Sequence, residues 1–127
     1  MRLTDRLLFT LRNILARDMF AVMRRYVQGH VLDVGGWDFF LYARAKQVNF
    51  DRWTTLEYDR TRGIGITDPK FELVHGDGCH MEFPDSSFDT VLNIQVLEHV
   101  FEPIKMVEEI SRVLKKGGYA IFLVPQT

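Results

Sequence analysis

Residues 76–103 read GDGCHMEFPDSSFDTVLNIQVLEHVFEP, and residues 108–125 read EEISRVLKKGGYAIFLVP. Each stretch contains a short run of β-branched, aliphatic and aromatic residues, at 88–94 and at 119–124, which predicts a buried strand. A helical pattern lies between the two runs, so together they predict a strand–helix–strand unit. Such a unit joins two parallel strands of one sheet, and its crossover is almost always right-handed.

The helix of this unit has a start, an apolar stripe and an end. Pro103 suits the first turn of a helix, and Gly117-Gly118 predict where the helix ends. The stripe consists of Ile104, Val107, Ile110 and Leu114. This spacing predicts a helix that buries one face against the sheet.

The same alternation extends upstream. Strands are predicted at residues 30–35, 52–58 and 71–75, with a helix over 38–48 and a loop rich in Gly, Thr and Asp at 59–69. Strands that alternate with helices indicate an α/β fold with a parallel, doubly wound sheet. A ligand of such a sheet lies outside the carboxyl ends of the strands, so the strand-to-helix junctions hold the candidate functional residues.

The N-terminal region, residues 1–28, differs in charge from the rest of the chain. Its six arginines and two aspartates give a net charge of +4, which leaves −5 for residues 29–127. Apolar residues at helical spacing predict an amphipathic helix over 4–28. We favour a helix that covers the sheet and keeps its arginines in solvent. The alternative is a peripheral contact with a membrane surface or a partner.

The composition is that of a single globular domain. The chain has 127 residues, of which 46% are hydrophobic and 26% are charged. A net charge of −1 gives no reason to expect a nucleic-acid partner. Cys79 is the only cysteine, which excludes an intrachain disulfide and favours a reducing cytoplasm. No apolar run approaches the roughly 20 residues that span a bilayer.

The first junction carries Asp33, Gly35 and Gly36. The two glycines let a ligand approach the backbone, although glycines at such a turn are often purely structural. The dinucleotide pattern G-x-G-x-x-G is absent, and so is a P-loop. A ligand without a phosphate is therefore favoured at this junction.

The next two junctions end in acids. Glu57 and Asp59 follow the second strand, about 20 residues beyond the glycines, where a carboxylate can accept both hydroxyls of a ribose. The alternative is a solvated loop acid. Asp77 lies between two glycines, where it can accept a hydrogen bond from an amino group such as that of adenine. The alternative is an aspartate that only forms a turn.

The fourth junction offers Asn93 and, further on, Glu98-His99. Neighbouring residues of a helix point in different directions, so Glu98 and His99 do not form a dyad with each other. His99 is a candidate catalytic base, with helix capping or packing as the alternative. Cys79 and His80 are too few to form a metal site, so we expect no metal.

Taken in order, these segments resemble the motifs of class I S-adenosylmethionine-dependent methyltransferases, and most closely the type 11 subgroup that modifies small molecules and lipids. VLDVGG at 31–36 is similar to the first motif, and TTLEYD at 54–59 to the acidic end of the second strand. GDGCHMEFPDSSFD, LNIQVLEHVFEP and EEISRVLKKGGYAIFLVP are similar, in order and spacing, to the later motifs. The resemblance covers about residues 29–125, and it implies that residues 29–127 form the cofactor-binding domain.

This resemblance implies a fold and a set of site residues. The Rossmann-like sheet would have the strand order 3-2-1-4-5, without the antiparallel hairpin that usually follows the fifth strand. S-adenosylmethionine would bind with its ribose on Glu57 and its adenine amino group on Asp77, and His99 would stand nearest the acceptor entrance. The implied cofactor-binding residues are Asp33, Gly35, Gly36, Glu57, Asp77, Gly78, Cys79, Asn93 and Ile94.

Two features depart from the family pattern. Trp37 follows Gly36 where the family usually continues G-x-G, so we expect Trp37 to narrow the methionine channel or to stack over the ligand. The chain stops at Thr127, so we expect an open edge on the fifth strand. Such an edge would pair in a homodimer or be covered by the N-terminal helix. We also expect slow or absent turnover by this chain alone.

The implied function is methyl transfer from S-adenosylmethionine to a small-molecule or lipid-linked acceptor. The reaction would be a direct displacement at the sulfonium methyl group, with orientation of the acceptor as the main contribution of the protein. One alternative is a non-catalytic or truncated cofactor-binding module. The other is a nucleotide-dependent oxidoreductase, against which the missing G-x-G-x-x-G argues.

Overall fold

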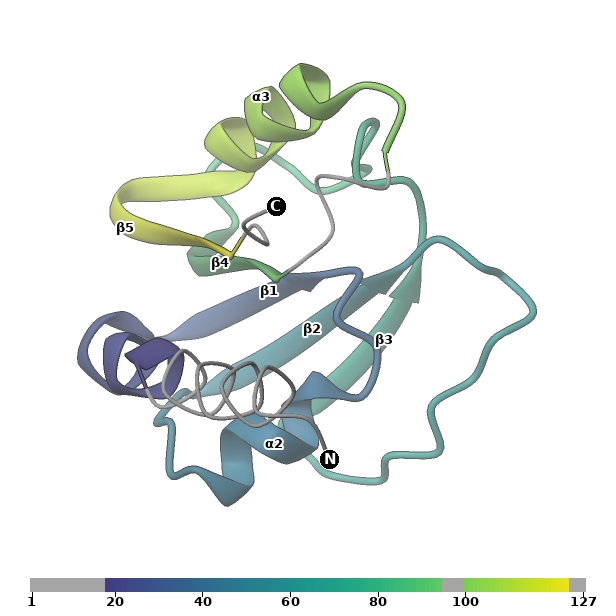
Figure 1. Cartoon of the computed structure of the whole chain (residues 1–127). Helices are drawn as coiled ribbons and strands as arrows, with labels where there is room; N and C mark the ends of the chain where they lie inside the picture. Colours follow the sequence, from purple (N-terminus) through teal and green to yellow (C-terminus); the bar gives the residue numbers. More distant parts are fainter. Residues whose placement is uncertain (1–17, 95–99, 124–127) are drawn as a thin grey trace, which may run out of the picture.

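A five-stranded parallel sheet forms the centre of the molecule (Figure 1). The computed structural model describes residues 18–94 and 100–123. The strands run in the order β3-β2-β1-β4-β5, and every neighbouring pair is parallel. They are β1 (His30–Val34), β2 (Arg52–Glu57), β3 (Phe71–His75), β4 (Phe88–Ile94) and β5 (Leu114–Leu123). The predicted fold class and strand order are confirmed.

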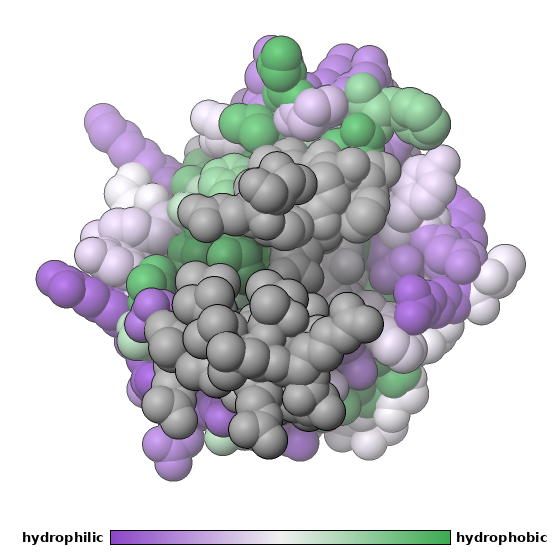
Figure 2. All heavy atoms as spheres, in the orientation of Figure 1, coloured by the Kyte–Doolittle hydropathy of each residue, from purple (hydrophilic) through white to green (hydrophobic). Residues whose placement is uncertain are grey.

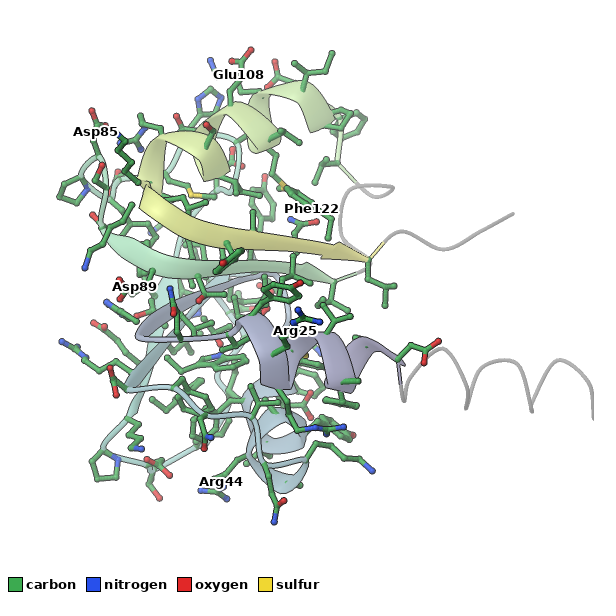
Figure 3. All side chains as sticks on the ribbon, turned by 90° about the vertical axis from the view of Figure 1, so that its left-hand side faces the viewer. Arg25, Arg44, Asp85, Asp89, Glu108 and Phe122 are labelled. Carbon is green, nitrogen blue, oxygen red and sulfur yellow. The ribbon has the colours of Figure 1, made fainter. Side chains whose placement is uncertain are left out.

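Helices cover both faces of this sheet. α3 (Pro103–Val113) lies on one face, and α2 (Phe39–Ala45) lies on the other, together with the N-terminal helical segment, residues 18–26. Figure 3 shows α3 and this segment on opposite sides of β4 and β5. The core on the α3 side includes Leu32, Val34, Leu56, Val91, Met106 and Ile110. The core on the α2 side includes Met23, Val31, Phe40, Trp53 and Leu92.

The start of β5 differs from the prediction. β5 begins at Leu114, directly after α3, so Gly117 and Gly118 lie inside the strand rather than at the end of the helix. A Cβ on Gly118 would lie 2.5 Å from the carbonyl oxygen of Asp89 on β4. The pairing of β4 with β5 is irregular at this point. Glycine is therefore needed here because two strands approach closely.

α2 is shorter than the predicted range of 38–48. The helix ends at Ala45, and Gln47 takes a left-handed φ of 60°. The N–H of Val48 donates to the carbonyl of Ala43 at 3.0 Å, which closes the last turn before the chain enters β2.

The N-terminal helical segment packs on the sheet, as the favoured interpretation predicts. Phe20 stacks on Phe39 of α2, with 5.9 Å between the ring centroids, and Tyr26 lies against Tyr119 of β5 at 5.0 Å. The first 17 residues of the chain, which include much of the predicted helix, lie outside the described residues. In the described part of the chain, no helix has the length and apolar character needed to cross a membrane.

Candidate functional site

Asp33 lies near the end of β1 and is fully buried. Among the described residues, neither of its carboxylate oxygens has a hydrogen-bond partner. The carboxyl group lies against Gly36, where a Cβ would overlap it. A buried polar group without a partner is unfavourable in the free protein, so this position is suited to a ligand that brings a donor or a positive charge.

Burial, and then the nearby charge of Glu57, raise the pKa of Asp33 to about 8. The backbone N–H of Gly36 opposes this rise without reaching hydrogen-bond geometry. Glu57 ends the neighbouring strand β2 and is itself only 8% exposed. Asp33 is therefore protonated at neutral pH in the free protein, and a cation beside it would favour the ionised form.

Glu57 also organises the start of the loop between β2 and β3. Its Oε1 accepts the N–H of Asp59 at 3.3 Å. Asp59 in turn accepts the hydroxyl of Thr61 at 2.6 Å and its N–H at 2.9 Å, and these two bonds hold the pKa of Asp59 below its usual range. Asp59 is thus tied into the loop, which leaves Glu57 as the acid beside Asp33.

Asp77 forms a tight turn after β3. Its Oδ1 accepts the N–H of Cys79 at 2.8 Å, and its carbonyl accepts the N–H of His80 at 3.0 Å. The thiol of Cys79 donates to the carbonyl of Glu102 at 3.6 Å, and burial raises the pKa of this thiol. The turn-forming role of Asp77 is therefore present, and the same carboxylate also borders a cavity.

This cavity, of about 360 Å³, lies between the strand ends and α3. Val34 and Leu56 line it from β1 and β2, and Met106 lines it from α3. A Cβ on Gly78 would lie 2.7 Å from Cε of Met106, so glycine makes room for that side chain. The other lining residues are Gly35, Tyr58, Gly76, Asp77, Cys79, Val100, Phe101 and Glu102. Largely apolar walls that also carry the acids Asp77 and Glu102 suit a flat ring with an amino group.

Asn93 is buried near the end of β4, on the α3 side of the sheet. Its Nδ2 donates to Sδ of Met106 at 3.2 Å, while its Oδ1 has no partner among the described residues. Ile94 is half-buried and packs toward the α2 side. The predicted base His99 lies outside the described residues.

Trp37 has a left-handed φ of 53°, which is uncommon for a bulky side chain. The guanidinium of Arg62 lies 3.8 Å from the centroid of its ring. The carbonyl of Arg62 lies 2.8 Å from Nε2 of His75. The stack therefore joins the turn after β1 to the loop after β2, and Trp37 packs on a side chain of the protein itself.

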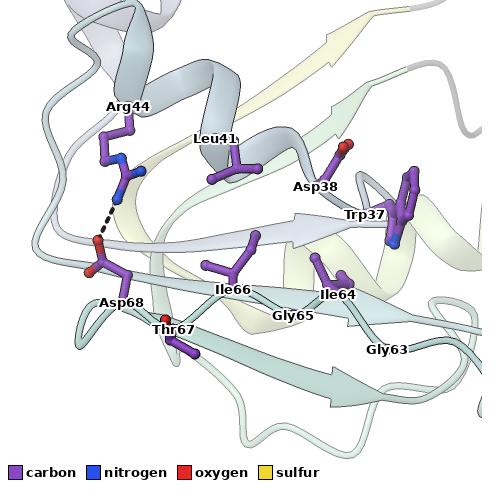
Figure 4. A pocket seen from close by; sticks show the side chains of 10 residues that line it. All are labelled: Trp37, Asp38, Leu41, Arg44, Gly63, Ile64, Gly65, Ile66, Thr67 and Asp68. Atoms are coloured by element: carbon purple, nitrogen blue, oxygen red, sulfur yellow. Dashed lines mark hydrogen bonds and ion pairs between the residues drawn. The ribbon is translucent and has the colours of Figure 1, made fainter.

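Trp37 also lines a second pocket, of about 380 Å³, between α2 and the loop that leads to β3 (Figure 4). Leu41 and Ile66 line its middle, and an ion pair of 2.8 Å between Arg44 and Asp68 closes the far end. This pocket runs along α2, away from the strand ends, and is separate from the cavity beside Asp77.

The predicted site residues converge on the carboxyl ends of the strands, on both sides of the sheet. Asp33 and Glu57 share the α2 side with Val31 and Trp53, because residues two apart on a strand face the same way. The cavity lies on the α3 side. Within residues 18–94 and 100–123, no three His, Cys, Asp or Glu side chains come together as metal ligands.

Eight lining residues of the cavity were not among the predicted site residues: Val34, Leu56, Tyr58, Gly76, Val100, Phe101, Glu102 and Met106. Tyr58 directly follows Glu57, so its position at a strand end was a usable signal. Phe101 and Met106 reach the cavity only because α3 docks on the sheet. No local pattern marks that contact.

Comparison with known proteins finds methyltransferases that are similar to most of this chain. A family model described as a methyltransferase domain matches residues 38–122. The chain is 41% identical over 71 residues to a probable S-adenosylmethionine-dependent methyltransferase of Mycolicibacterium smegmatis, a match that covers 54% of this chain and 27% of that protein. It is 44% identical over 63 residues to a demethylmenaquinone methyltransferase of Clavibacter sepedonicus, covering 50% and 25%. It is 38% identical over 65 residues to a phosphatidylethanolamine N-methyltransferase of Cereibacter sphaeroides, covering 51% and 32%.

Solved structures share the fold. An S-adenosyl-L-methionine-dependent methyltransferase from Methanococcus maripaludis superposes with a TM-score of 0.67 at 20% identity, over 86% of this chain and 53% of that chain. A methyltransferase from Bacillus halodurans superposes with a TM-score of 0.68 at 25% identity, over 83% and 48%. The chain thus spans about half the length of these structures, and the matches cover a third or less of the three relatives above.

Proposed function

The chain belongs to the S-adenosylmethionine-dependent methyltransferase family, and we propose that it binds this cofactor across the carboxyl ends of β1 to β4 and transfers its methyl group. Membership in the family implies S-adenosylmethionine as the cofactor. The observation that carries the proposal is the position of Asp33, Glu57 and Asp77 at or just after the carboxyl ends of three neighbouring strands, with a cavity beside Asp77.

The residues present fit the chemistry of this cofactor. Glu57 would accept the ribose hydroxyls. The apolar cavity would hold the adenine, with Asp77 accepting from its amino group and the backbone of Gly78-Cys79 at its edge. Asp33, buried and without a partner, would face the positively charged methionine part above Gly35-Gly36.

When bound, S-adenosylmethionine supplies a methyl group on an electrophilic sulfonium. Asn93 and Ile94, at the end of β4, would border that centre. The main task of the protein is to orient the acceptor in line with the methyl group, which can contribute roughly 7–11 kcal/mol. A base is needed only where the acceptor is not already nucleophilic, and His99 is our candidate for it.

We propose a small-molecule or lipid-linked acceptor. Two of the relatives are named for demethylmenaquinone and phosphatidylethanolamine. The apolar surface of the chain supports an apolar acceptor: Phe101 is fully exposed where it borders the cavity, and Ile104 and Val107 are exposed along α3. Figure 2 shows hydrophobic side chains gathered on this part of the surface.

We also propose a cellular location for the protein and roles for its two regions. We place it in the cytoplasm, where the thiol of Cys79 stays reduced. For residues 1–28 we keep the favoured role of a helix on the sheet; in the alternative, their basic side chains would bring the protein to a membrane surface that holds a lipid acceptor. Residues 29–127 would form the cofactor-binding domain. No nucleic-acid partner is proposed.

Isothermal titration with S-adenosylmethionine and with NAD tests the binding step. We expect binding of the first and none of the second. Glu57→Ala should weaken binding by about 1.5–3 kcal/mol, because hydrogen bonds to a charged acceptor are lost. Asp51→Ala, at the opposite end of the same strand, is the matched control and should bind like the parent. Failure to bind S-adenosylmethionine would contradict the proposal.

A methyl-transfer assay with labelled S-adenosylmethionine tests the catalytic step. Transfer to quinone or lipid acceptors would support the enzyme. Cofactor binding with slow or absent transfer is what we expect of this chain alone, and complete absence of transfer would support the non-catalytic or truncated cofactor-binding module.

A further inference from the structure

Building on the proposed function, we propose that Asp33 makes the site sensitive to the charge of its ligand. Cationic S-adenosylmethionine binds with release of a proton from Asp33, while S-adenosylhomocysteine, which lacks the sulfonium charge, releases less. The preference for the cofactor over its product then grows with pH. Asp33 becomes a specificity-determining residue, and the released proton goes to solvent.

The geometry isolates the carboxyl group of Asp33. The side chain is fully buried, and neither oxygen has a hydrogen-bond partner among the described residues. Gly36 lies so close that no side chain fits between them. In the sheet, Asp33 is in register with Thr55 on β2 and Leu92 on β4, both fully buried. In the described part of the free protein, only the nearby N–H of Gly36 favours a negative charge at this position, and it does not reach hydrogen-bond geometry.

The described elements around Asp33 offer one titratable group. Glu57 on β2 faces Asp33 and adds a second negative charge. The core on this side of the sheet is apolar, and it includes Leu92 of β4, Phe40 of α2 and Met23 of the N-terminal helical segment. No cationic side chain of the described residues contributes to the charge balance of Asp33. The ligand is therefore the source of positive charge that the two acids lack.

The direction of the pH dependence follows from this environment. Burial and Glu57 raise the pKa of Asp33 to about 8, so the group is protonated in the free protein at neutral pH. A bound cation lowers that pKa, because it favours the charged form. Affinity for a cation then rises with pH until Asp33 is ionised in the free protein as well, and is level above that point. The product keeps its amino-group charge but not the sulfonium charge, so its affinity rises less steeply.

Titration calorimetry between pH 6 and pH 9, with each ligand, measures this linkage. The dissociation constant for S-adenosylmethionine should fall by up to roughly tenfold per pH unit below pH 8 and then level off. Repeating the titration at pH 7 in two buffers of different ionisation enthalpy counts the protons released. We expect close to one proton with S-adenosylmethionine and fewer with S-adenosylhomocysteine.

Two variants assign the effect to Asp33. Asp33→Asn should make the affinity for S-adenosylmethionine independent of pH, while the exposed control Asp51→Asn keeps the dependence of the parent. Glu57→Gln leaves Asp33 in place and should move the midpoint of the dependence to lower pH. The last variant reports on the linkage even if Asp33→Asn does not fold.

Three results would overturn the inference: a pH-independent affinity of the parent protein, a dependence that survives in Asp33→Asn, or the same dependence for both ligands. Each of these results still requires binding. Absence of binding at every pH would contradict the proposed function instead, so the two failures are distinguishable.

Discussion

At the scale of single residues, Gly36 must be a glycine because a side chain at this position would overlap the carboxyl group of Asp33. Alanine at Gly36 would place its Cβ on the buried carboxyl group, so the strand or the turn must shift. We expect Gly36→Ala to lower the free energy of unfolding by about 1–3 kcal/mol. The matched control is Gly63→Ala, where a Cβ meets nothing within 4 Å. Equal stability of the two variants in urea denaturation would contradict this packing.

The raised pKa of Asp33 also predicts how the stability of the ligand-free protein depends on pH. Its pKa is about 8 in the folded protein against an ordinary value of 3.8, so the folded state holds a proton that the unfolded chain has lost. The stabilisation that this proton gives to the folded state is complete below pH 3.8. As the pH rises toward 8 it is lost, and the free energy of unfolding falls by up to about 1.4 kcal/mol per pH unit.

The melting temperature should therefore fall between pH 7 and pH 8.5, which lies above the range in which His30, whose pKa is lowered by burial, titrates. Glu109 and Asp89, whose pKa values are lowered by hydrogen bonds, are already ionised in this range and add no slope. Asp33→Asn should remove most of the fall. If the parent and the variant lose stability in parallel, the buried carboxyl is not the cause.

The positions of the candidate acids could be predicted residue by residue, because they stand at predicted strand ends; their roles in binding stay predictions. Asp33, Glu57 and Asp77 were all identified in this way. The sequence does not show that Asp33 lacks a partner or that Asp77 also forms a turn, because both depend on contacts made only in the fold. The stacking partner of Trp37 could not be predicted for the same reason, because Arg62 comes from a different loop.

At the scale of elements, one side chain ties α3 to the loop between β3 and β4. Arg112 donates to the carbonyls of Met81 at 2.9 Å and Phe83 at 2.8 Å. It also pairs with Asp85 at 2.8 Å and with Glu109 at 3.0 Å. The hydrogen bond from Arg112 is the main reason that the pKa of Glu109 is lowered. The loop carrying the cavity turn is thus anchored to the helix that forms the cavity wall.

Arg112→Lys should loosen this anchor, because lysine keeps the charge but cannot reproduce the planar fork of donors. We expect the free energy of unfolding to fall by about 1–3 kcal/mol, since backbone acceptors are left unpaired. Amide hydrogen exchange should accelerate over residues 81–87. Lys105→Ala, on the exposed side of α3, is the control. Unchanged exchange in Arg112→Lys would show that the loop is held by other contacts.

The first and last residues of a strand or helix could be predicted where the residues next to them carry the sequence signal. The strand runs matched β3 and β4 at both ends, and Pro103 marked the first residue of α3. The predicted boundary between α3 and β5 was wrong, because the prediction rested on Gly117-Gly118, and such glycines normally end helices. Here Gly118 is required by the approach of Asp89 from a neighbouring strand, which is a tertiary effect.

At the scale of the whole molecule, β5 is one of the two edge strands of the sheet, and β3 is the other. Among the described residues β5 pairs only with β4. Tyr119 and Phe122 are exposed along β5, and Figure 3 labels Phe122. Open edges of this kind recruit further strands. We expect the measured mass to rise with concentration in light scattering, and Phe122→Lys to reduce that rise. A monomer mass for the parent at every concentration would contradict pairing through this edge.

The central claim is that S-adenosylmethionine lies across the carboxyl ends of β1 to β4. Titration of the nitrogen-15-labelled chain with S-adenosylhomocysteine, followed by amide chemical shifts, locates the ligand directly. We predict the largest shifts at residues 35–37, 57–59 and 77–79, and small shifts at Asp51 and Lys70, which lie at the opposite ends of the strands. Shifts concentrated at Asp51 and Lys70, or along the second pocket beside Arg44, would contradict the account.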